Sequence, residues 1–197
     1  VIIWAPEPLA KLMETVDGID HVITQYSPST QFDVQIPLMS LPGVFQDSLE
    51  SIPTSTPYLG PSSLCGKIHP IKKIGISWAG SGNQPLDRRS VPFEQFQPLL
   101  QDDSIQWHNL QYDTPTPSGL IDHGTEMTNF AATADVIDSL DLIITIDSAI
   151  AHLAGAMGKP VWIILNFAAD WRWGLDKDRT PWYPSAQLFR QAPNQPW

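Results

Sequence analysis

The stretch TIDSAIAHLAGAMGKP, residues 145–160, carries polar side chains at a spacing that suits the binding of an anion. Asp147 ends an apolar run, Ser148 follows it, and His152 comes one helical turn later on the same side. In open α/β sheets, ligands bind beyond the carboxyl ends of the strands. The free N–H groups at Ser148 and Ala149 would favour an anion there. A structural alternative stays open, in which Ser148 only caps a helix and His152 is a hydrogen-bonded core residue.

A second candidate is the loop WAGSGNQPLDRRS, residues 78–90, which follows another apolar run. Its glycines allow the backbone to approach a ligand closely. Arg88 and Arg89 stand out in an acidic chain, and a guanidinium suits bidentate contacts with phosphate. The alternative is a solvated basic pair on a loop. The loop contains neither GxGxxG nor GxxxxGK[ST], so it lacks the dinucleotide fingerprint and the P-loop.

A third candidate is the segment DWRW, which follows the apolar run PVWIIL and therefore belongs to the same edge of the sheet as Asp147. Trp171 and Arg172 could stack on a base or a sugar ring. Trp173 is at least as well explained as a structural residue that packs the tail. Trp182 and Tyr183 are expected to be core residues.

Several kinds of site are excluded or disfavoured by what the sequence lacks. It has no HExxH and no GxSxG motif, and its five histidines show no metal-ligand spacing. Cys65 is the single cysteine, so neither an internal disulfide nor a cysteine-based zinc site can form. No Asp-x-Asp pair follows a predicted strand. We therefore expect neither a metal ion nor a cofactor.

The elements that must position these residues follow from the hydrophobic pattern. Apolar runs predict strands at residues 1–6, 21–26, 73–80, 105–111, 141–147 and 160–165, with a further extended stretch at 32–42. Helical spacing predicts helices at residues 7–18, 93–101, 129–140 and 148–157. The tail, residues 166–191, is expected to be mostly loop. Strands that alternate with helices imply a parallel sheet, so the predicted fold class is α/β and Rossmann-like.

The composition indicates a globular chain with an acidic surface. Of its 197 residues, 42% are hydrophobic and 16% charged, and the formal net charge is −10. Such a charge disfavours nucleic acids and anionic membranes as partners. The longest apolar region, residues 142–165, is interrupted by Asp147, His152 and Lys159, so no membrane span is expected. A single cysteine fits a reducing compartment, and we expect a cytoplasmic location.

A change of composition suggests two parts. Residues 43–70 are rich in Pro, Ser, Thr and Gly, which predicts a linker. We expect residues 1–66 to be the remnant of a Rossmann-like domain with its linker, and residues 67–197 to be a ligand-binding Rossmann-like domain. The chain opens on Val1 within an apolar run and lacks the basic start of a signal peptide. It is therefore expected to begin inside a larger protein.

The segments DLIITIDSAIAHLAGAMGKPVWIIL, DWRW and PWYPSAQLFRQ resemble the C-terminal domain of glycosyltransferase family 9, whose members are heptosyltransferase-like. The branch it resembles most is fused to tetratricopeptide repeats in bacterial proteins. IPLMSLPGVFQDSLESIPTSTPYL and KIGISWAGSGNQPLDRRSVPFEQF are similar to the same branch, so the resemblance covers nearly the whole chain.

This resemblance implies a GT-B fold, in which two Rossmann-like domains face each other and the C-terminal one holds a nucleotide-sugar donor without a metal ion. By matched position, the donor diphosphate would bind at Asp147, Ser148, Ala149 and His152. The loop that lines the phosphates would supply Arg88 and Ser90. The base or sugar pocket is expected to include Trp171, Arg172 and Gly80.

Two departures from the family pattern affect the expected activity. Family members carry their catalytic base early in the N-terminal domain, and this chain has only the last part of that domain. The catalytic residue is therefore unknown. The family also shows Asp-Phe-x-x-Thr before the donor-site strand, whereas this chain has Asn129 in place of the acid, a conservative change for capping a helix.

The sequence therefore predicts the donor-binding portion of an inverting, metal-independent glycosyltransferase. It would transfer a sugar from a nucleoside-diphosphate sugar to an acceptor hydroxyl on a glycan, a lipid or a protein. A non-catalytic nucleotide-sugar-binding or scaffold module of a repeat protein is the alternative. A Rossmann oxidoreductase is disfavoured by the missing GxGxxG motif.

Overall fold

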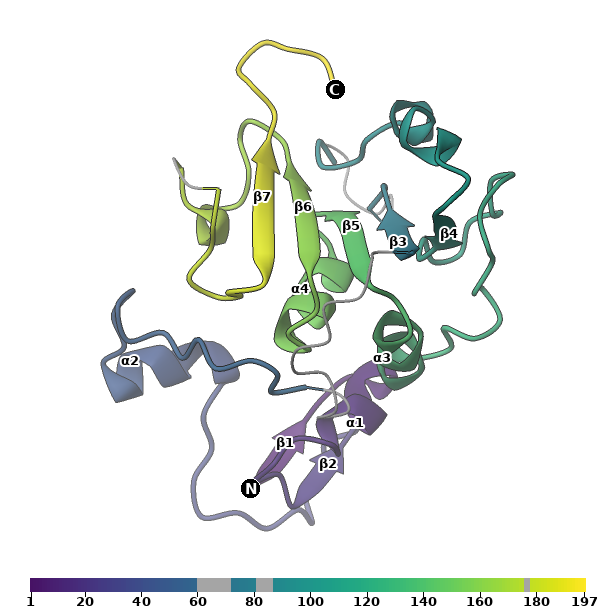
Figure 1. Cartoon of the computed structure of the whole chain (residues 1–197). Coiled ribbons are helices and arrows are strands. Elements are labelled where there is room, and N and C mark those ends of the chain that lie inside the picture. The colour runs from purple at the N-terminus through teal and green to yellow at the C-terminus, as the bar shows by residue number, and fades with distance from the viewer. Residues whose placement is uncertain (60–71, 81–86, 176–177) are drawn as a thin grey trace.

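A parallel sheet of five strands forms the main body of the protein, in the order β4-β3-β5-β6-β7 (Figure 1). The computed structural model describes residues 1–59, 72–80, 87–175 and 178–197. The strands are β3 Lys73–Ser77, β4 Gln106–Asn109, β5 Leu142–Ile146, β6 Val161–Leu165 and β7 Ala186–Arg190. The predicted α/β class with a Rossmann-like parallel sheet is confirmed.

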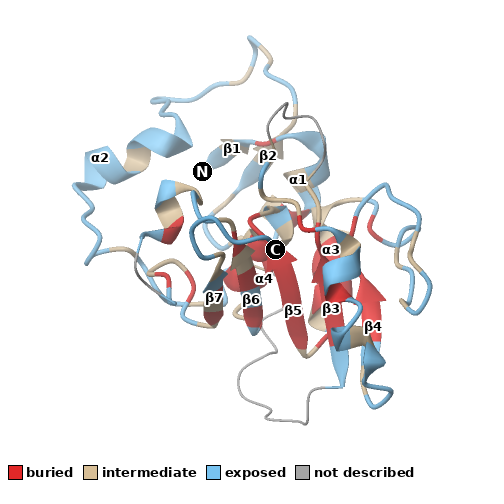
Figure 2. Cartoon of the chain, turned by 90° about the horizontal axis from the view of Figure 1, so that it is seen from above, coloured by how far each residue is buried: buried red, intermediate tan, exposed pale blue. Residues whose placement is uncertain are grey.

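Two helices, α3 Phe130–Asp138 and α4 Ala149–Ala156, pack on one face of this sheet. Their apolar side chains share one core with Ile143 of β5 and Ile163 of β6, both of which are fully buried. Figure 2 shows that β5 is buried along its length. Burial of this kind is the main favourable term in folding. Asn129 caps α3, because its Oδ1 accepts a hydrogen bond of 3.0 Å from the N–H of Ala132. This is the capping role predicted for Asn129.

The opposite face of the sheet is covered by short 3-10 turns rather than by a helix. These turns are η2 Phe93–Phe96 and η3 Leu99–Gln101, and the ring of Phe96 packs against Ile76 and Ile144. The prediction of one helix over residues 93–101 is therefore wrong. Pro98 has no N–H to donate and separates the two turns, which explains the interruption.

The first residues form a small parallel β-α-β unit, in which β1 Ile2–Trp4 pairs with β2 His21–Ile23 across α1 Glu7–Met13. These elements confirm the first two strands and the helix that the sequence predicts, although α1 ends at Met13 rather than near Gly18. The side chain of Leu12 is buried in the same core as α3, so the unit is attached to the main body through α1.

Two other predictions are corrected by the structure. The stretch 32–42 is not a strand: it leads through η1 Leu38–Ser40 into a short helix, α2 Leu41–Phe45. Prolines at the start of each element explain this, since proline suits the first turn of a helix. The tail, expected to be loop, contains β7, which pairs in parallel with β6. The proposed boundary at residue 66 lies outside the described residues, as does Cys65.

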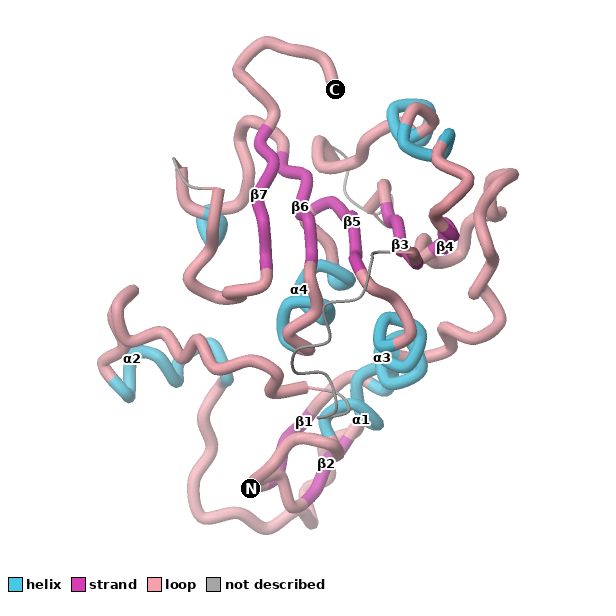
Figure 3. The backbone as a smooth tube through the Cα atoms, in the orientation of Figure 1, coloured by secondary structure: helices cyan, strands magenta, loops and turns pink. Residues whose placement is uncertain are grey.

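The strand order creates a crevice at one edge of the sheet. The chain passes from β3 to β4 on one side and then returns to β5 on the other side of β3 (Figure 3). Such a reversal separates the loops that follow β3 and β5, and ligands bind in the crevice outside the carboxyl ends of these strands. The fold therefore predicts a site formed by the residues that follow β3, β5 and β6.

Candidate functional site

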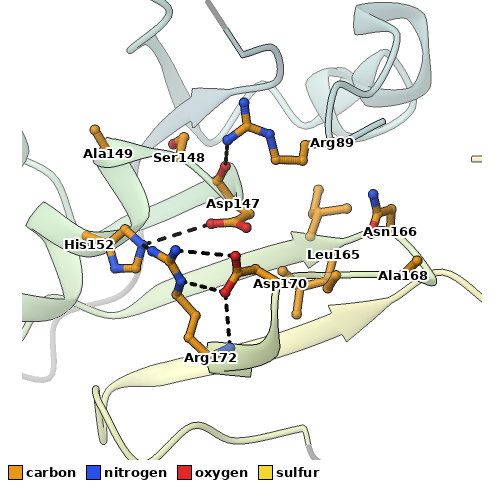
Figure 4. A pocket seen from close by; sticks show the side chains of 12 residues that line it. Arg89, Asp147, Ser148, Ala149, His152, Leu165, Asn166, Ala168, Asp170 and Arg172 are labelled. Atoms are coloured by element: carbon orange, nitrogen blue, oxygen red, sulfur yellow. Dashed lines mark hydrogen bonds and ion pairs between the residues drawn. The ribbon is translucent and has the colours of Figure 1, made fainter. Parts of the chain in front are cut away.

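A cleft of about 570 Å³ lies at this edge of the sheet, a volume within the usual range of ligand sites. The residues that line it come from the end of β6 and from the segments that follow β3, β5 and β6 (Figure 4). The lining residues are Arg89, Asp147, Ser148, Ala149, His152, Ile164, Leu165, Asn166, Ala168, Ala169, Asp170 and Arg172. The cleft therefore coincides with the crevice that the strand order creates.

Asp147 lies at the centre of the cleft, directly after β5. Only 9% of its surface is exposed, and its backbone carbonyl accepts a hydrogen bond of 3.2 Å from Nη1 of Arg89. Its Oδ1 is 3.9 Å from Nε2 of His152. Asp147 thus contacts Arg89 through its backbone and lies near His152 through its carboxylate.

Ser148 occupies the N-cap position of α4, but its side chain makes no capping hydrogen bond. Its Oγ pairs instead with Oγ1 of Thr145 at 3.0 Å. The first-turn N–H groups of α4 therefore face the cleft without a side-chain acceptor from Ser148. These groups and the helix dipole make this end of α4 favourable for an anion. Ser148 thus takes the N-cap position that the structural alternative expects, but its side chain does not cap the helix.

Two Asp-x-Arg units of the same design flank Asp147. In the first, the carboxylate of Asp87 accepts from Nε and Nη2 of Arg89 at 3.0 and 3.1 Å, and from the backbone N–H of Arg89 at 2.9 Å. In the second, Asp170 accepts from Nε and Nη2 of Arg172 at 2.8 and 3.3 Å, and from the N–H of Arg172 at 3.1 Å. Each fork-to-fork pair fixes the direction of a guanidinium at the cleft.

In each Asp-x-Arg unit, the aspartate and the arginine stabilise each other's charged form. The arginine in each unit lowers the pKa of its aspartate through hydrogen bonds, and the aspartate raises the pKa of its arginine in return. The negative charge of Asp147 also raises the pKa of both Arg89 and Arg172. Both guanidiniums are therefore held in their charged form on either side of Asp147.

His152 connects the cleft to the buried core. Nη1 of Arg172 lies 3.2 Å from its Nε2, and the hydroxyl of Tyr183 lies 2.9 Å from its Nδ1. The imidazole stacks on the indole of Trp173 at a centroid distance of 5.2 Å. Burial lowers the pKa of His152, and the positive charge of Arg172 lowers it further. The imidazole is therefore neutral at pH 7.

Residues 78–80, directly after β3, are held in place by hydrogen bonds, which come mainly from Gln111 in the segment after β4. Oε1 of Gln111 accepts hydrogen bonds from the N–H groups of Trp78 and Ala79 at 3.2 and 2.9 Å. Gly80 follows, and a Cβ on it would overlap with Oδ2 of Asp87. Gly80 therefore has a clear structural task, which is to let Asp87 lie against the backbone and orient Arg89.

The structure brings together five of the site residues named from the sequence: Asp147, Ser148, Ala149, His152 and Arg172. The other four do not line the cleft. The backbone carbonyl of Arg88 accepts from Nδ2 of Asn166, and Oγ of Ser90 accepts from the N–H of Gly80. Trp171 is 72% exposed.

Asp170 and Asn166 line the cleft but were not predicted from the sequence, and Tyr183, predicted to be a core residue, contacts His152. Of the two adjacent arginines, Arg89 lines the cleft, whereas the resemblance pointed to Arg88. A signal for the two flanking units is present, because both DRR and DWR place an aspartate two residues before an arginine. No local signal marks Tyr183, since its contact with His152 joins residues 31 positions apart.

Metal binding and membrane spanning can also be checked against the structure. Within residues 1–59, 72–80, 87–175 and 178–197, no three His, Cys, Asp or Glu side chains are grouped so that they could hold a metal ion. In the same part of the chain, no helix has the length and apolar character needed to cross a bilayer.

Comparisons with known proteins bear on the same region. Protein FlbA of Caulobacter vibrioides is 29% identical over 140 residues, which cover 62% of this chain and 22% of FlbA. The chain thus spans about a fifth of the length of this curated relative. No solved structure matches the chain. Residues 126–194, which supply β5, α4, β6 and both Asp147 and Arg172, match the model of glycosyltransferase family 9 (heptosyltransferase).

Proposed function

We propose that the cleft binds the diphosphate of a nucleoside-diphosphate sugar, and that this chain is the donor-binding portion of a glycosyltransferase. The observation that carries the proposal is the convergence of two oriented guanidiniums and the N-terminus of α4 on one cleft. The match of residues 126–194 to glycosyltransferase family 9 supports the reaction class.

The arrangement of positive charge suits a ligand with two linked phosphates. Arg89 and Arg172 come from different segments of the chain, and the positive charge of Arg172 is close enough to lower the pKa of Arg89. A diphosphate between them would receive bidentate contacts from two sides and N–H groups from α4. Because the chain is acidic overall, such local donors must overcome a repulsive field.

The proposed reaction is an inverting displacement that needs no metal ion. The acceptor oxygen attacks the anomeric carbon, the bond from that carbon to the diphosphate breaks, and a base takes the proton of the acceptor hydroxyl. Negative charge grows on the leaving diphosphate, and the two arginines and the N–H groups of α4 would stabilise it.

The carboxylates of the two flanking units are poorly suited to act as that base. The arginine in each pair lowers the pKa of Asp87 and of Asp170, which makes both carboxylates weak proton acceptors. The proposal therefore assigns the base to a part of the enzyme other than these residues. The alternative is a module that binds nucleotide sugars without turnover, and it is consistent with the same two Asp–Arg pairs.

The proposal extends to the acceptor, the cellular location and the full-length protein. The acceptor would be a hydroxyl of a glycan, a lipid or a protein, in the cytoplasm, and the full-length protein would carry tetratricopeptide repeats. The single cysteine fits the reducing compartment.

A thermal-shift screen with UDP, ADP and GDP tests the proposal. At least one of them should raise the melting temperature, because a ligand that binds only the folded state stabilises it. Ser148→Asp should remove this shift by placing a negative charge at the start of α4, against the phosphates. Ser29→Asp, at an exposed position, controls for the change in net charge. If none of the three nucleotides shifts the wild-type protein, the proposal fails.

A further inference from the structure

A continuous chain of polar contacts runs from the cleft into the core through His152. Nη1 of Arg172 lies 3.2 Å from Nε2 of His152, and Nδ1 of the same ring lies 2.9 Å from the hydroxyl of Tyr183. Arg172 is partly exposed at the cleft, whereas Tyr183 is 8% exposed. These contacts therefore link Arg172, which faces the cleft, to Tyr183, which is buried.

The chemistry of these groups determines which ring nitrogen carries the proton. A guanidinium has donors only, so Nε2 of His152 must present its lone pair to Arg172. A neutral imidazole has one N–H, which must then be on Nδ1, and this N–H donates to the Tyr183 oxygen. The hydroxyl of Tyr183 is the acceptor that this tautomer requires.

The competing tautomer has a poorer partner. If Nε2 carried the proton, it would face Oδ1 of Asp147 at 3.9 Å, which is too long for a hydrogen bond. It would also point an N–H at a guanidinium that can only donate. The contacts of His152 therefore favour the Nδ1–H form on both sides of the ring.

Tyr183 is itself held firmly in place. Its ring lies against Gly155, one turn of α4 after His152, where a Cβ would stand 2.6 Å from Cδ2 of Tyr183. The side chain of Tyr58 lies beside its hydroxyl, and the N–H of Tyr58 donates to the carbonyl of Ala156 at 2.9 Å. Burial and the neighbouring Tyr58 raise the pKa of Tyr183, so its hydroxyl stays protonated.

We propose that Tyr183 is a positioning residue: it fixes His152 in the Nδ1–H tautomer, and His152 in turn holds the guanidinium of Arg172 toward the cleft. The consequence for ligand binding rests on the proposed function, but the tautomer of His152 in the free protein does not. Stacking on Trp173 keeps the ring plane in place without choosing between the tautomers, so the choice depends on the polar contacts at the two ring nitrogens, and the hydroxyl of Tyr183 supplies the acceptor at Nδ1.

The test is ¹⁵N NMR of the imidazole of His152 in the free, full chain, with its signals assigned by their loss in His152→Gln. The wild-type protein should show a protonated Nδ1 and an unprotonated Nε2. Tyr183→Phe keeps the ring but removes the acceptor, and it should shift the ring toward a mixture of both tautomers. A wild-type ring that is mainly Nε2–H, or a Tyr183→Phe spectrum that matches wild type, would overturn the proposal.

Two further measurements separate positioning from simple packing and from the proposed function. Tyr26→Phe, at an exposed tyrosine, should leave the signals of His152 unchanged. The best ligand among UDP, ADP and GDP should bind Tyr183→Phe about tenfold more weakly, the effect of one lost hydrogen bond. If the affinity is unchanged although the tautomer changes, the proposal that His152 holds Arg172 toward the cleft is refuted. If wild type binds none of the three, the proposed function fails while the tautomer result still stands.

Discussion

The ring of Tyr183 packs so closely on Gly155 that a Cβ on this glycine would stand 2.6 Å from Cδ2 and 2.7 Å from Cδ1 of the tyrosine. Gly155 lies in the last turn of α4, and glycine within a helix ordinarily weakens it by about 1 kcal/mol relative to alanine. The close approach explains why a glycine stands there: only a residue without a side chain lets Tyr183 reach His152 across this helix.

Gly155→Ala is therefore expected to destabilise the protein despite the better helix propensity of alanine. Overpacking against a buried ring costs about 1–3 kcal/mol. Gly43→Ala is the matched control, because Gly43 is also helical and a Cβ on it would have no other atom within 4 Å. Chemical denaturation should show a lower free energy of unfolding for Gly155→Ala alone. A stabilised Gly155→Ala variant would contradict the packing described for Tyr183.

Arg89 and its neighbour Arg88 offer a sharp test of which arginine contacts the ligand. Arg89→Gln should weaken binding of the best nucleoside diphosphate about tenfold or more, because a charged, bidentate contact is lost. Arg88→Gln should leave the affinity within about twofold of wild type, since its side chain does not line the cleft. Calorimetric titration measures both. The reverse order of effects would assign the phosphate contact to Arg88, as predicted from the sequence.

The stability of the protein should decrease as the pH falls from 7 to 5. Burial lowers the pKa of both His108 and His152 below the ordinary value of 6.5. Below pH 6.5 the unfolded chain therefore binds more protons than the folded chain, and the free energy of unfolding decreases until the folded histidines titrate. Carboxylates with lowered pKa, such as Asp87, are ionised in both states throughout this window.

Urea denaturation at pH 7 and pH 5 measures this effect. His108→Gln should reduce the difference in the free energy of unfolding between the two pH values, because it removes one of the histidines whose pKa is lowered. His21→Gln removes an exposed histidine and serves as the control. A free energy of unfolding that rises as the pH falls would show that His108 and His152 are not held neutral.

Lys159 should contribute to stability through the end of α3. Its Nζ donates to the carbonyls of Asp138 and Leu140 at 2.5 and 3.0 Å, and it lies 3.5 Å from Oδ1 of Asp138. Lys159→Met keeps the aliphatic stem but leaves these acceptors without a donor, which should cost about 2–3 kcal/mol. Lys11→Met, at an exposed position in α1, should change the free energy of unfolding by less than about 0.5 kcal/mol. Equal effects of both substitutions would rule out this role for Lys159.

Local patterns in the sequence are sufficient to predict most of the elements that build the site. The apolar runs of β3, β5 and β6, the helical spacing of α3 and α4, and the cap at Asn129 all depend on interactions within a few residues. For the same reason, the sequence alone assigns Asp147, Ser148 and His152 to the end of a strand and the start of a helix.

The tertiary structure decided how distant segments meet. It placed Arg89 rather than Arg88 at the cleft, where Nη1 of Arg89 donates to the carbonyl of Asp147, a residue 58 positions away in the sequence. It also placed β7 beside β6 and brought Tyr183 to His152. These contacts depend on the paths of whole loops and on space left by small residues, and neither is encoded in the spacing of neighbouring side chains.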